Sequence, residues 1–328
     1  MMDVLLGIDT SNYRTSLCLV TMEGEIIGEQ KQLLTVEEGE KGLQQSVALF
    51  QHIKRLPLLA KEMAMDDKNL VAVAVSRAPR PVEGSYMPVF LAGQAAAEMI
   101  AHFHQVPVYY TTHQEGHIAA GEYTMNKPLA ADHFLAVHLS GGTSELLDCT
   151  RTQSGYQIAL IGGTDDLHAG QLIDRVGVAL GLPFPAGPYL EKLANESQEA
   201  TTEEFAVPSS VNGYTFSFSG PETALLKAVN NSEIPRPAIA RAAEKCIANT
   251  LEKVLRRVVE NGFARDILIV GGVSANAYIR SRLVKRLEHP AVKARLHFAD
   301  PAYAGDNAFG TARLGLIQYK RRKKTNII

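Results

Sequence analysis

Two segments of the chain share one pattern, in which an apolar run, a short polar turn and a second apolar run follow one another. The first segment covers residues 4–20 with its turn at residues 9–12, and the second covers residues 134–149 with its turn at residues 140–144. Each is typical of two strands joined as a hairpin. Because the same opening recurs about 130 residues later, the sequence indicates two related half-molecules.

Alternating helix and strand patterns follow each opening and predict an α/β protein with mixed sheets. The expected strands cover residues 70–75, 106–110, 267–270 and 295–298. The expected helices cover residues 42–64, 87–104, 166–180, 238–260, 277–287 and 306–318, with a further helix starting at His113. Pro57 must kink or divide the first of them. We expect the less regular stretch 194–220 to be an insertion over a cleft.

Composition and charge narrow the function classes. Hydrophobic residues make up 46% and charged residues 21% of the 328, which excludes disorder and suggests two globular domains. The formal net charge of −2 gives no overall attraction to nucleic acid or anionic lipid. A local basic patch is available at Lys320-Arg321-Arg322-Lys323-Lys324, which is either a solvated end or a tRNA contact.

Three cysteines, Cys18, Cys149 and Cys246, are too few for a disulfide framework in a chain of this length. Their apolar surroundings in the sequence predict buried, reduced thiols and a reducing compartment. No run is long and apolar enough to cross a bilayer, and residues 1–12 have no cationic signal region. We therefore expect a cytoplasmic protein with no membrane partner.

His113 and His117 are spaced four residues apart, so on a helix they share one face and can converge on a metal ion. Two ligands are insufficient, and a third must come from elsewhere. The pattern is not that of zinc proteases, because Glu115 does not directly follow the first histidine. The alternative is a polar helix start that contains two histidines by chance.

Three turns have the composition of phosphate-binding loops. A buried strand pattern ends in Gly271-Gly272 before a helix, which brings backbone N–H groups and a helix N-terminus to one point. The turns at residues 9–12 and 140–143 add hydroxyls and amides. Each turn alone is explained by ordinary turn chemistry. Together they match the three phosphate-contacting segments of an actin-like ATPase cleft.

Two groups of carboxylates precede or open predicted helices. Asp306 either caps the last helix or supplies a third metal ligand. Asp165, Asp166 and Asp174 flank or lie on a helix that could line the same cleft.

Seven motifs, in order along nearly the whole chain, resemble those of the TsaD/Gcp family, once described as O-sialoglycoprotein endopeptidases. They are GIDTSN, THQEGH, LSGGTSEL, AGQLIDRVGVALGLPFPAGP, TFSFSG, GGVSAN and AGDNA. That family makes the N6-threonylcarbamoyl modification of adenosine 37 in tRNA. The resemblance implies the actin-like fold shared with sugar kinases and Hsp70, with two related lobes of mixed sheets around a central cleft. It places the lobes at residues 1–130 plus 306–328 and at residues 131–305.

The resemblance also implies ligands and site residues. One divalent metal, iron or zinc, would be bound by His113, His117 and Asp306. An adenine nucleotide or threonylcarbamoyl-adenylate would contact Leu139, Ser140, Gly141, Gly142, Thr143, Asp174, Gly187 and Asn276. The expected partners are tRNA and either a paralogous protein or a second copy of the chain.

Several positions depart from the family pattern around the expected nucleotide. Thr143 replaces a histidine, Gln171 a glutamate and Glu222 a lysine, so a phosphate counter-charge is missing. The opening turn lacks the usual acidic pair. The loop at residues 77–84 carries two arginines that could grip an anion.

The favoured function is metal-dependent transfer of a threonylcarbamoyl group from threonylcarbamoyl-adenylate to N6 of adenosine 37 in tRNA, an acyl transfer. One alternative is a divergent paralogue that acts as a carbamoyl-type transferase on another acceptor. Another is a nucleotide-binding, non-catalytic partner protein. A metalloprotease is the weakest interpretation, since no glutamate is placed as its general base.

Overall fold

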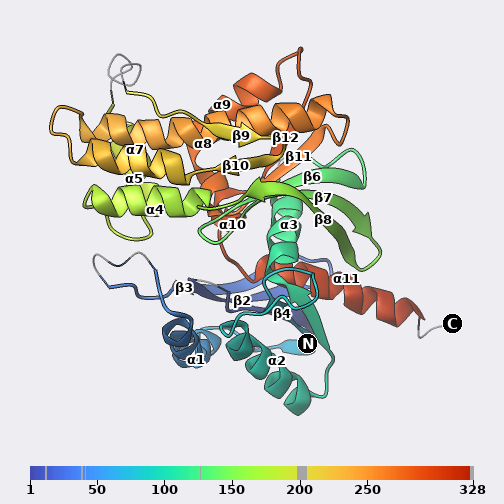
Figure 1. Cartoon of the computed structure of the whole chain (residues 1–328). Helices are drawn as coiled ribbons and strands as arrows, with labels where there is room; N and C mark the ends of the chain where they lie inside the picture. Colours follow the sequence, from blue (N-terminus) through green and yellow to red (C-terminus); the bar gives the residue numbers. More distant parts are fainter. Residues whose placement is uncertain (12, 38–39, 41, 126, 198–204, 326–328) are drawn as a thin grey trace.

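The computed structural model describes all residues except 12, 38–39, 41, 126, 198–204 and 326–328. Two mixed sheets lie one above the other, with α3 and α11 between them and with helices such as α2 and α8 on their outer sides (Figure 1). None of the helices within the described residues is long and apolar enough to span a membrane.

The first sheet has the strand order β3-β2-β1-β4-β5. Its strands are β1 (Met2–Asp9), β2 (Arg14–Thr21), β3 (Ile26–Leu33), β4 (Lys68–Ala78) and β5 (Val108–Thr112). The predicted hairpin is confirmed, because β1 pairs antiparallel with β2. The apolar run 70–75 belongs to β4, which pairs in parallel with β1 and β5, as a strand buried on both faces requires.

Helices cover both faces of this sheet. On one face lie α1 (Gln45–Lys61) and α2 (Phe90–His104), which pack against alternate residues of the strands. On the other face lies α11 (Phe309–Thr325). Its close approach depends on Gly7, because a Cβ there would lie 2.5 Å from the carbonyl oxygen of Ala308.

The second sheet has the strand order β12-β11-β6-β7-β8-β10-β9. Its strands are β6 (His133–Leu139), β7 (Ser144–Thr152), β8 (Gly155–Thr164), β9 (Ser210–Asn212), β10 (Thr215–Ser217), β11 (Asp266–Val270) and β12 (Arg295–Phe298). The series β8-β7-β6-β11-β12 repeats the order and the strand directions of β3-β2-β1-β4-β5. The predicted duplication is therefore visible in the topology.

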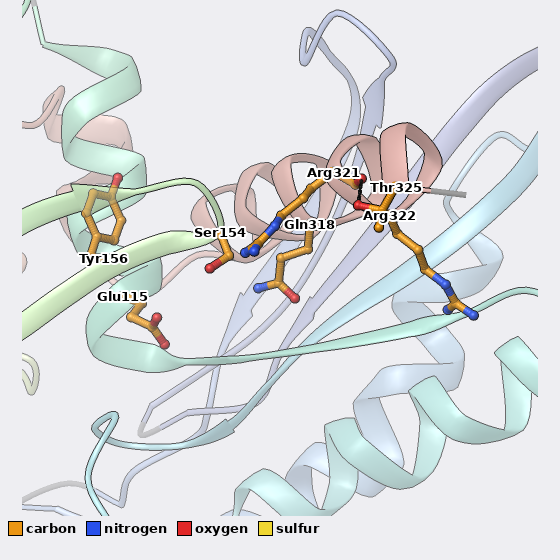
Figure 2. Close-up of a pocket in the computed structure, with 7 residues that line it drawn as sticks. All are labelled: Glu115, Ser154, Tyr156, Gln318, Arg321, Arg322 and Thr325. Atoms are coloured by element: carbon orange, nitrogen blue, oxygen red, sulfur yellow. Dashed lines mark hydrogen bonds between the residues drawn. The ribbon is translucent and has the colours of Figure 1, made fainter. Parts of the chain in front are cut away.

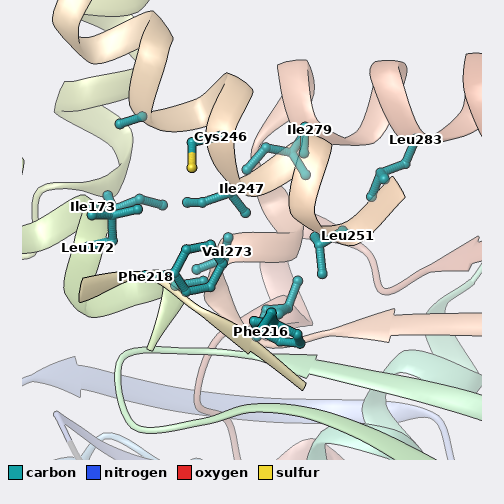
Figure 3. Close-up of a cluster of buried hydrophobic side chains, with 14 of the residues drawn as sticks. Leu172, Ile173, Phe216, Phe218, Cys246, Ile247, Leu251, Val273, Ile279 and Leu283 are labelled. Carbon is teal, nitrogen blue, oxygen red and sulfur yellow. The ribbon is translucent and has the colours of Figure 1, made fainter. Parts of the chain in front are cut away.

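The outer face of the second sheet carries the largest apolar core. Its helices are α4 (Ala169–Ala179), α5 (Gly187–Ala194), α7 (Ser219–Val229), α8 (Arg236–Glu260) and α9 (Ala277–Leu287). Figure 3 shows how Phe216 and Phe218 meet side chains from α8 and α9, among them Leu251 and Ile279. The inner face of the sheet packs against α3 (His113–Thr124).

Three predicted elements need correction. Pro57 does not divide α1, which is continuous; the proline lies on the exposed face, where water can satisfy the carbonyl that loses its N–H partner. The last helix begins at Phe309, and Asn307, which accepts a hydrogen bond from the backbone N–H of Gly310, caps it in place of Asp306. The stretch 194–220 is no simple insertion, since its described part forms the edge strands β9 and β10, whereas residues 198–204 lie outside the described residues.

The lobe boundaries stay a prediction, which the two sheets support. Strands β1–β5 and helix α11 fall in residues 1–130 plus 306–328, and strands β6–β12 fall in residues 131–305. All three cysteines are buried and free, as predicted.

Candidate metal centre

The start of α3 places the two histidines. Strand β5 ends at Thr112, whose side chain accepts a hydrogen bond from the backbone N–H of Glu115, while the Glu115 carboxylate accepts one from the N–H of Thr112. This reciprocal cap begins the helix at His113 and directs His113 and His117 to one face. It also occupies Glu115, so this carboxylate is not available as the general base of a metalloprotease.

The structure brings the three predicted metal ligands together. The Nε2 atoms of His113 and His117 are 3.0 Å apart, and each lies 3.3 Å from Oδ1 of Asp306. Asp306 lies on the segment between α10 (Pro301–Ala304) and α11. Arg14 donates a hydrogen bond to the backbone carbonyl oxygen of Asp306 at 3.1 Å. Three potential donors therefore surround a single point, from two elements that lie almost 200 residues apart in sequence.

Burial and charge at this point favour a cation. The side chains of His113 and Asp306 are 14% exposed and that of His117 is 1% exposed, so the group is accessible from one side. Although burial opposes protonation of His113, the charge of Asp9 and hydrogen bonds to Asp306 and Asp9 raise its pKa to about 10. Burial and the charge of His113 lower the pKa of His117. Burial alone would raise the pKa of Asp306, but its bonds to the two histidines hold it well below the usual range.

The donor chemistry fits a transition metal. Two imidazole nitrogens and one carboxylate oxygen are ligands that zinc and iron accept. A divalent ion at this point would replace the proton that His113 otherwise holds. The residues present could therefore hold the metal that the sequence predicts.

Asp9 supports His113 from behind, a role that the sequence analysis did not assign to it. Its Oδ2 atom lies 3.2 Å from Nδ1 of His113 and accepts a hydrogen bond from Oγ of Ser76 at 2.7 Å. Its Oδ1 atom accepts hydrogen bonds from the backbone N–H and the hydroxyl of Ser11. A carboxylate on the far nitrogen of a ligating histidine fixes the ring and raises its basicity.

A third imidazole lies beside the pair and was also missed. The His138 ring centre is 4.6 Å from that of His117 and 6.3 Å from that of His113. Burial, followed by the charge of His117, holds the pKa of His138 well below its ordinary value, so this ring is neutral. His138 belongs to strand β6 and directly precedes Leu139, the first residue of the segment that the sequence analysis assigned to the nucleotide.

The turn at residues 140–143 closes the hairpin of β6 and β7 next to this group. The backbone N–H of Ser140 donates to the carbonyl of Thr143 at 2.7 Å, and a Cβ at Gly141 or Gly142 would meet no atom within 4 Å. Gly142 is thus exposed to a ligand, whereas the backbone nitrogen of Gly141 packs against Gly170 of α4. Leu139 differs, because its side chain is fully buried in the apolar core.

The other turn, at Gly271, requires glycine for its conformation. Its φ of +90° is left-handed, and a Cβ there would collide with the carbonyl oxygen of Leu139. At Gly272, which begins the short 3₁₀ helix η1 (Gly272–Ala275), a Cβ would meet no atom within 4 Å. The two predicted phosphate turns are thus packed against each other through Leu139 and Gly271.

Asn276 and Asp174 both have protein partners. The Asn276 side chain caps α9 by accepting a hydrogen bond from the N–H of Ile279, and it donates one to Glu244 at 2.6 Å. Asp174 accepts a hydrogen bond from the N–H of Ala186 at 2.8 Å. Helix α5 begins at the next residue, Gly187, where a Cβ would meet no atom within 4 Å. A nucleotide contact by these residues stays a prediction.

Burial makes the charge of Asp174 costly, and this yields a pH-dependent prediction. Burial raises its pKa to about 6, above the ordinary 3.8. Stability linked to its protonated form is therefore complete below pH 4 and is lost as the pH rises through 6. Asp174→Asn keeps an acceptor for Ala186, so it should stabilise the protein increasingly from pH 5 to pH 8, by about 1 kcal/mol over that range. Urea unfolding at both pH values measures this, and an equal effect at both would contradict the buried charge.

The positions that depart from the family pattern also find partners in the chain. Glu222 pairs with Arg175 at 3.0 Å, so its charge is not left facing a phosphate without compensation. Arg80 pairs with Glu145 at 2.5 Å and remains half-exposed, close enough to His138 to affect its pKa. Gln171 accepts a hydrogen bond from the N–H of His168 before α4. Of the two loop arginines, only Arg80 is thus shown close to the histidines.

Comparisons with known proteins agree along the chain. A family model described as TsaD, tRNA N6-adenosine threonylcarbamoyltransferase, matches residues 25–313. A protein of that name from Thermus thermophilus is 33% identical, over 98% of this chain and 93% of its own length. Another from Geobacillus thermodenitrificans is 29% identical, over 98% of this chain and 94% of its own length.

Solved structures are similar in fold at low identity. Full-length HypF in its phosphate- and nucleotide-bound form has a TM-score of 0.57 at 14% identity, covering 97% of this chain and 46% of that protein. Component A of (R)-2-hydroxyglutaryl-CoA dehydratase from Acidaminococcus fermentans has a TM-score of 0.56 at 14% identity, covering 98% of this chain and 99% of that protein. These neighbours have the actin-like ATPase fold, so the predicted fold class is confirmed.

Proposed function

Because the chain belongs to the TsaD family of tRNA N6-adenosine threonylcarbamoyltransferases, which are acyltransferases, we propose that it transfers a threonylcarbamoyl group from threonylcarbamoyl-adenylate to N6 of adenosine 37 in tRNA. One observation carries the proposal beyond family membership, the convergence of His113, His117 and Asp306 within 4.8 Å. These three residues would hold iron or zinc. When bound, such an ion supplies Lewis acidity that polarises an acyl group.

The residues of the chain have defined tasks in this transfer. Asp9 holds the His113 ring in one orientation. The exposed Gly142 leaves space for the phosphate of the donor, and Arg80 supplies a half-exposed positive charge nearby. A bond forms between adenine N6 and the carbamoyl carbon, the bond from that carbon to the phosphate oxygen breaks, AMP leaves, and the N6 proton passes to solvent.

The comparisons do not favour the alternatives. A non-catalytic partner protein would have no need for two buried imidazoles and a carboxylate at one point. A carbamoyl-type transferase acting on another acceptor would use the same group, and only the acceptor would distinguish it. An assay that offers tRNA together with the adenylate decides between these functions.

A surface for tRNA is provided by the basic end of α11. Residues 320–324 are all exposed cations. None of them forms a salt bridge with another described residue. Arg321 and Arg322 are among the residues that line a cavity of about 530 Å³. Figure 2 shows that Arg321 extends toward Ser154 and Gln318, whereas Arg322 extends away from them. Phe309 and Arg321 are twelve residues apart on the helix, so this surface lies ~18 Å from the metal-proximal end of α11. An RNA bound at the metal centre can span that distance.

Charge reversal tests this surface. The double variant Arg321→Glu/Lys324→Glu should raise the KM for tRNA about tenfold and leave kcat nearly unchanged, because backbone phosphate contacts provide binding and not chemistry. The salt dependence of tRNA binding should weaken by roughly 0.7–0.9 in log–log slope per lost contact. The matched control Lys61→Glu/Lys227→Glu makes the same change of charge on α1 and α7. Equal effects of the two double variants would refute the assignment.

We propose that a protein partner binds α1 and α2, which cover the face of the first sheet opposite to α11. Large apolar side chains are exposed on α1 and α2: Val47, Phe50, Ile53, Leu58, Leu91, Met99 and Phe103. An apolar cavity of about 340 Å³ opens between these helices and the sheet. Exposed apolar surface of this kind is typical of protein interfaces. The paralogue or second copy expected from the sequence would dock here.

A further inference from the structure

Glu244 is a carboxylate buried at the edge of the largest apolar core. It lies on α8 and is fully buried, and its neighbours on the helix, Ala243 and Ile247, belong to that core. Burial raises the pKa of Glu244 to about 7, although a hydrogen bond from Asn276 and the charge of Arg241 oppose the rise. Replacing a buried ion pair by apolar side chains of similar volume is often neutral or stabilising. Stability alone therefore does not explain a glutamate at this position.

The contacts of Glu244 fix the orientation of the Asn276 side chain. Oε1 of Glu244 accepts a hydrogen bond from Nδ2 of Asn276 at 2.6 Å, and Oδ1 of Asn276 accepts one from the backbone N–H of Ile279 at 2.9 Å. An ionised carboxylate only accepts hydrogen bonds, so the amide cannot turn over without losing both of these. The second N–H of Nδ2 has no partner among the described residues, so the fixed side chain keeps one donor for a ligand.

Arg241 connects Glu244 to the other helix whose start the sequence analysis assigned to the nucleotide. Its guanidinium pairs with Oε2 of Glu244, donates a hydrogen bond to Oδ1 of Asn195 at 2.7 Å and lies 4.2 Å from the ring centre of Tyr278. Asn195 ends α5, the helix that begins at Gly187, and Tyr278 lies in the first turn of α9. Glu244 and Arg241 therefore join α5 to the start of α9.

We infer that Glu244 is a positioning residue for the adenine nucleotide, because it holds the Asn276 amide with one N–H free to donate to that ligand. The inference rests on the proposed function, which requires a bound adenylate, and it gives Glu244 no contact with the reacting atoms. Since the amide presents a donor, the atom that it recognises must be an acceptor, such as a ring nitrogen of adenine or a ribose oxygen. Loss of the carboxylate should weaken nucleotide binding only through Asn276.

A double-mutant cycle with AMP tests this coupling in the full-length protein. Calorimetric titration at pH 8, above the pKa of Glu244, measures the AMP affinity of the wild type, Glu244→Gln, Asn276→Ala and the double variant. In Glu244→Gln an NH₂ group must face either Asn276 or Arg241, so we expect about tenfold weaker binding. Asn276→Ala should weaken binding at least as much, and the double variant should bind AMP no more weakly than Asn276→Ala. A merely structural effect of Glu244 would persist in the Asn276→Ala background.

A second buried glutamate of α8 provides the matched control. Glu252 lies about two turns further along the helix, and its hydrogen bonds within the described residues come from Arg256 and from Arg286. Glu252→Gln should leave the AMP affinity unchanged, and far-UV circular dichroism establishes that all variants are folded. Glu244→Met removes the charge at similar volume and should lose the same affinity, so it takes the place of Glu244→Gln if that variant does not fold.

Three results would overturn the inference while the proposed function stands. They are wild-type AMP affinity in Glu244→Gln, wild-type affinity in Asn276→Ala, and the same loss from Glu244→Gln with and without Asn276. If the wild type binds no AMP, the proposed function fails together with the inference.

Discussion

Replacement of His117 by alanine is expected to eliminate stoichiometric metal binding and to lower threonylcarbamoyl transfer by about 10³-fold or more, since Lewis-acid stabilisation supplies several kcal/mol to a transition state. The side chain is almost completely buried and its Nε2 atom faces both His113 and Asp306. No other described donor lies close enough to replace it within the group of three. Metal content by mass spectrometry and the rate of transfer at saturating donor measure the two effects.

The control for this variant is an exposed histidine outside the site. His104→Ala, at the end of α2, removes the same side chain and should retain full metal content and activity. Far-UV circular dichroism establishes that both variants are folded. Full activity of a folded, metal-free His117→Ala protein would show that the reaction does not need this centre.

Asp9→Asn should lower metal affinity by about 10–100-fold, with a matching loss of activity at limiting metal. The aspartate accepts hydrogen bonds at both oxygens, from Ser11 at one and from Ser76 and His113 at the other. An asparagine has the same shape but carries an NH₂ group in place of one carboxylate oxygen. That group faces either Ser11 or the pair Ser76 and His113, and the residues that it faces lose their acceptor. The ring of His113 then loses its fixed orientation.

Ser76→Ala separates this effect from a general loss of packing. It removes one hydroxyl donor to Asp9 but leaves the carboxylate on His113, so its effect on metal affinity should be much smaller. Metal titration of the three proteins ranks them. If Asp9→Asn binds metal as tightly as the wild type, the contact between Asp9 and His113 has no role in the site.

The fold was predictable where local patterns carry it. The two hairpins, the parallel strand β4 and the long helix α8 all have apolar periodicities that need no tertiary context. Strand β3 was missed because its sequence IIGEQKQL is largely polar, as suits an exposed edge strand. The strands β9 and β10 have three residues each, which is too short for a period to be recognised.

The candidate metal centre was likewise predictable only in part. The spacing of His113 and His117 identified one face of a helix, and the need for a third ligand pointed to Asp306. Asp9 contacts His113 from the first sheet, and His138 packs beside His117 from the second. No local pattern in the sequence encodes such contacts. Asp9 was assigned to a polar turn but is the last residue of strand β1, and the assignment of His138 to an apolar strand is correct but incomplete.

The charged departures show why a residue type alone does not reveal its effect. Glu222 in place of a lysine suggested a missing counter-charge, but Arg175 from α4 neutralises it. Arg80 suggested an anion-binding residue, but Glu145 partly neutralises its positive charge. Net charge at the site therefore depends on pairs formed between distant segments.

The central claim is tested most directly by nucleoside analysis of adenosine 37. Metal-loaded protein is incubated with threonylcarbamoyl-adenylate and unmodified tRNA, and the tRNA is then digested and analysed by mass spectrometry. Our account predicts N6-threonylcarbamoyladenosine at position 37, one AMP released per modification, and neither product with His117→Ala. Adenosine 37 left unmodified by the metal-loaded wild type would contradict the account.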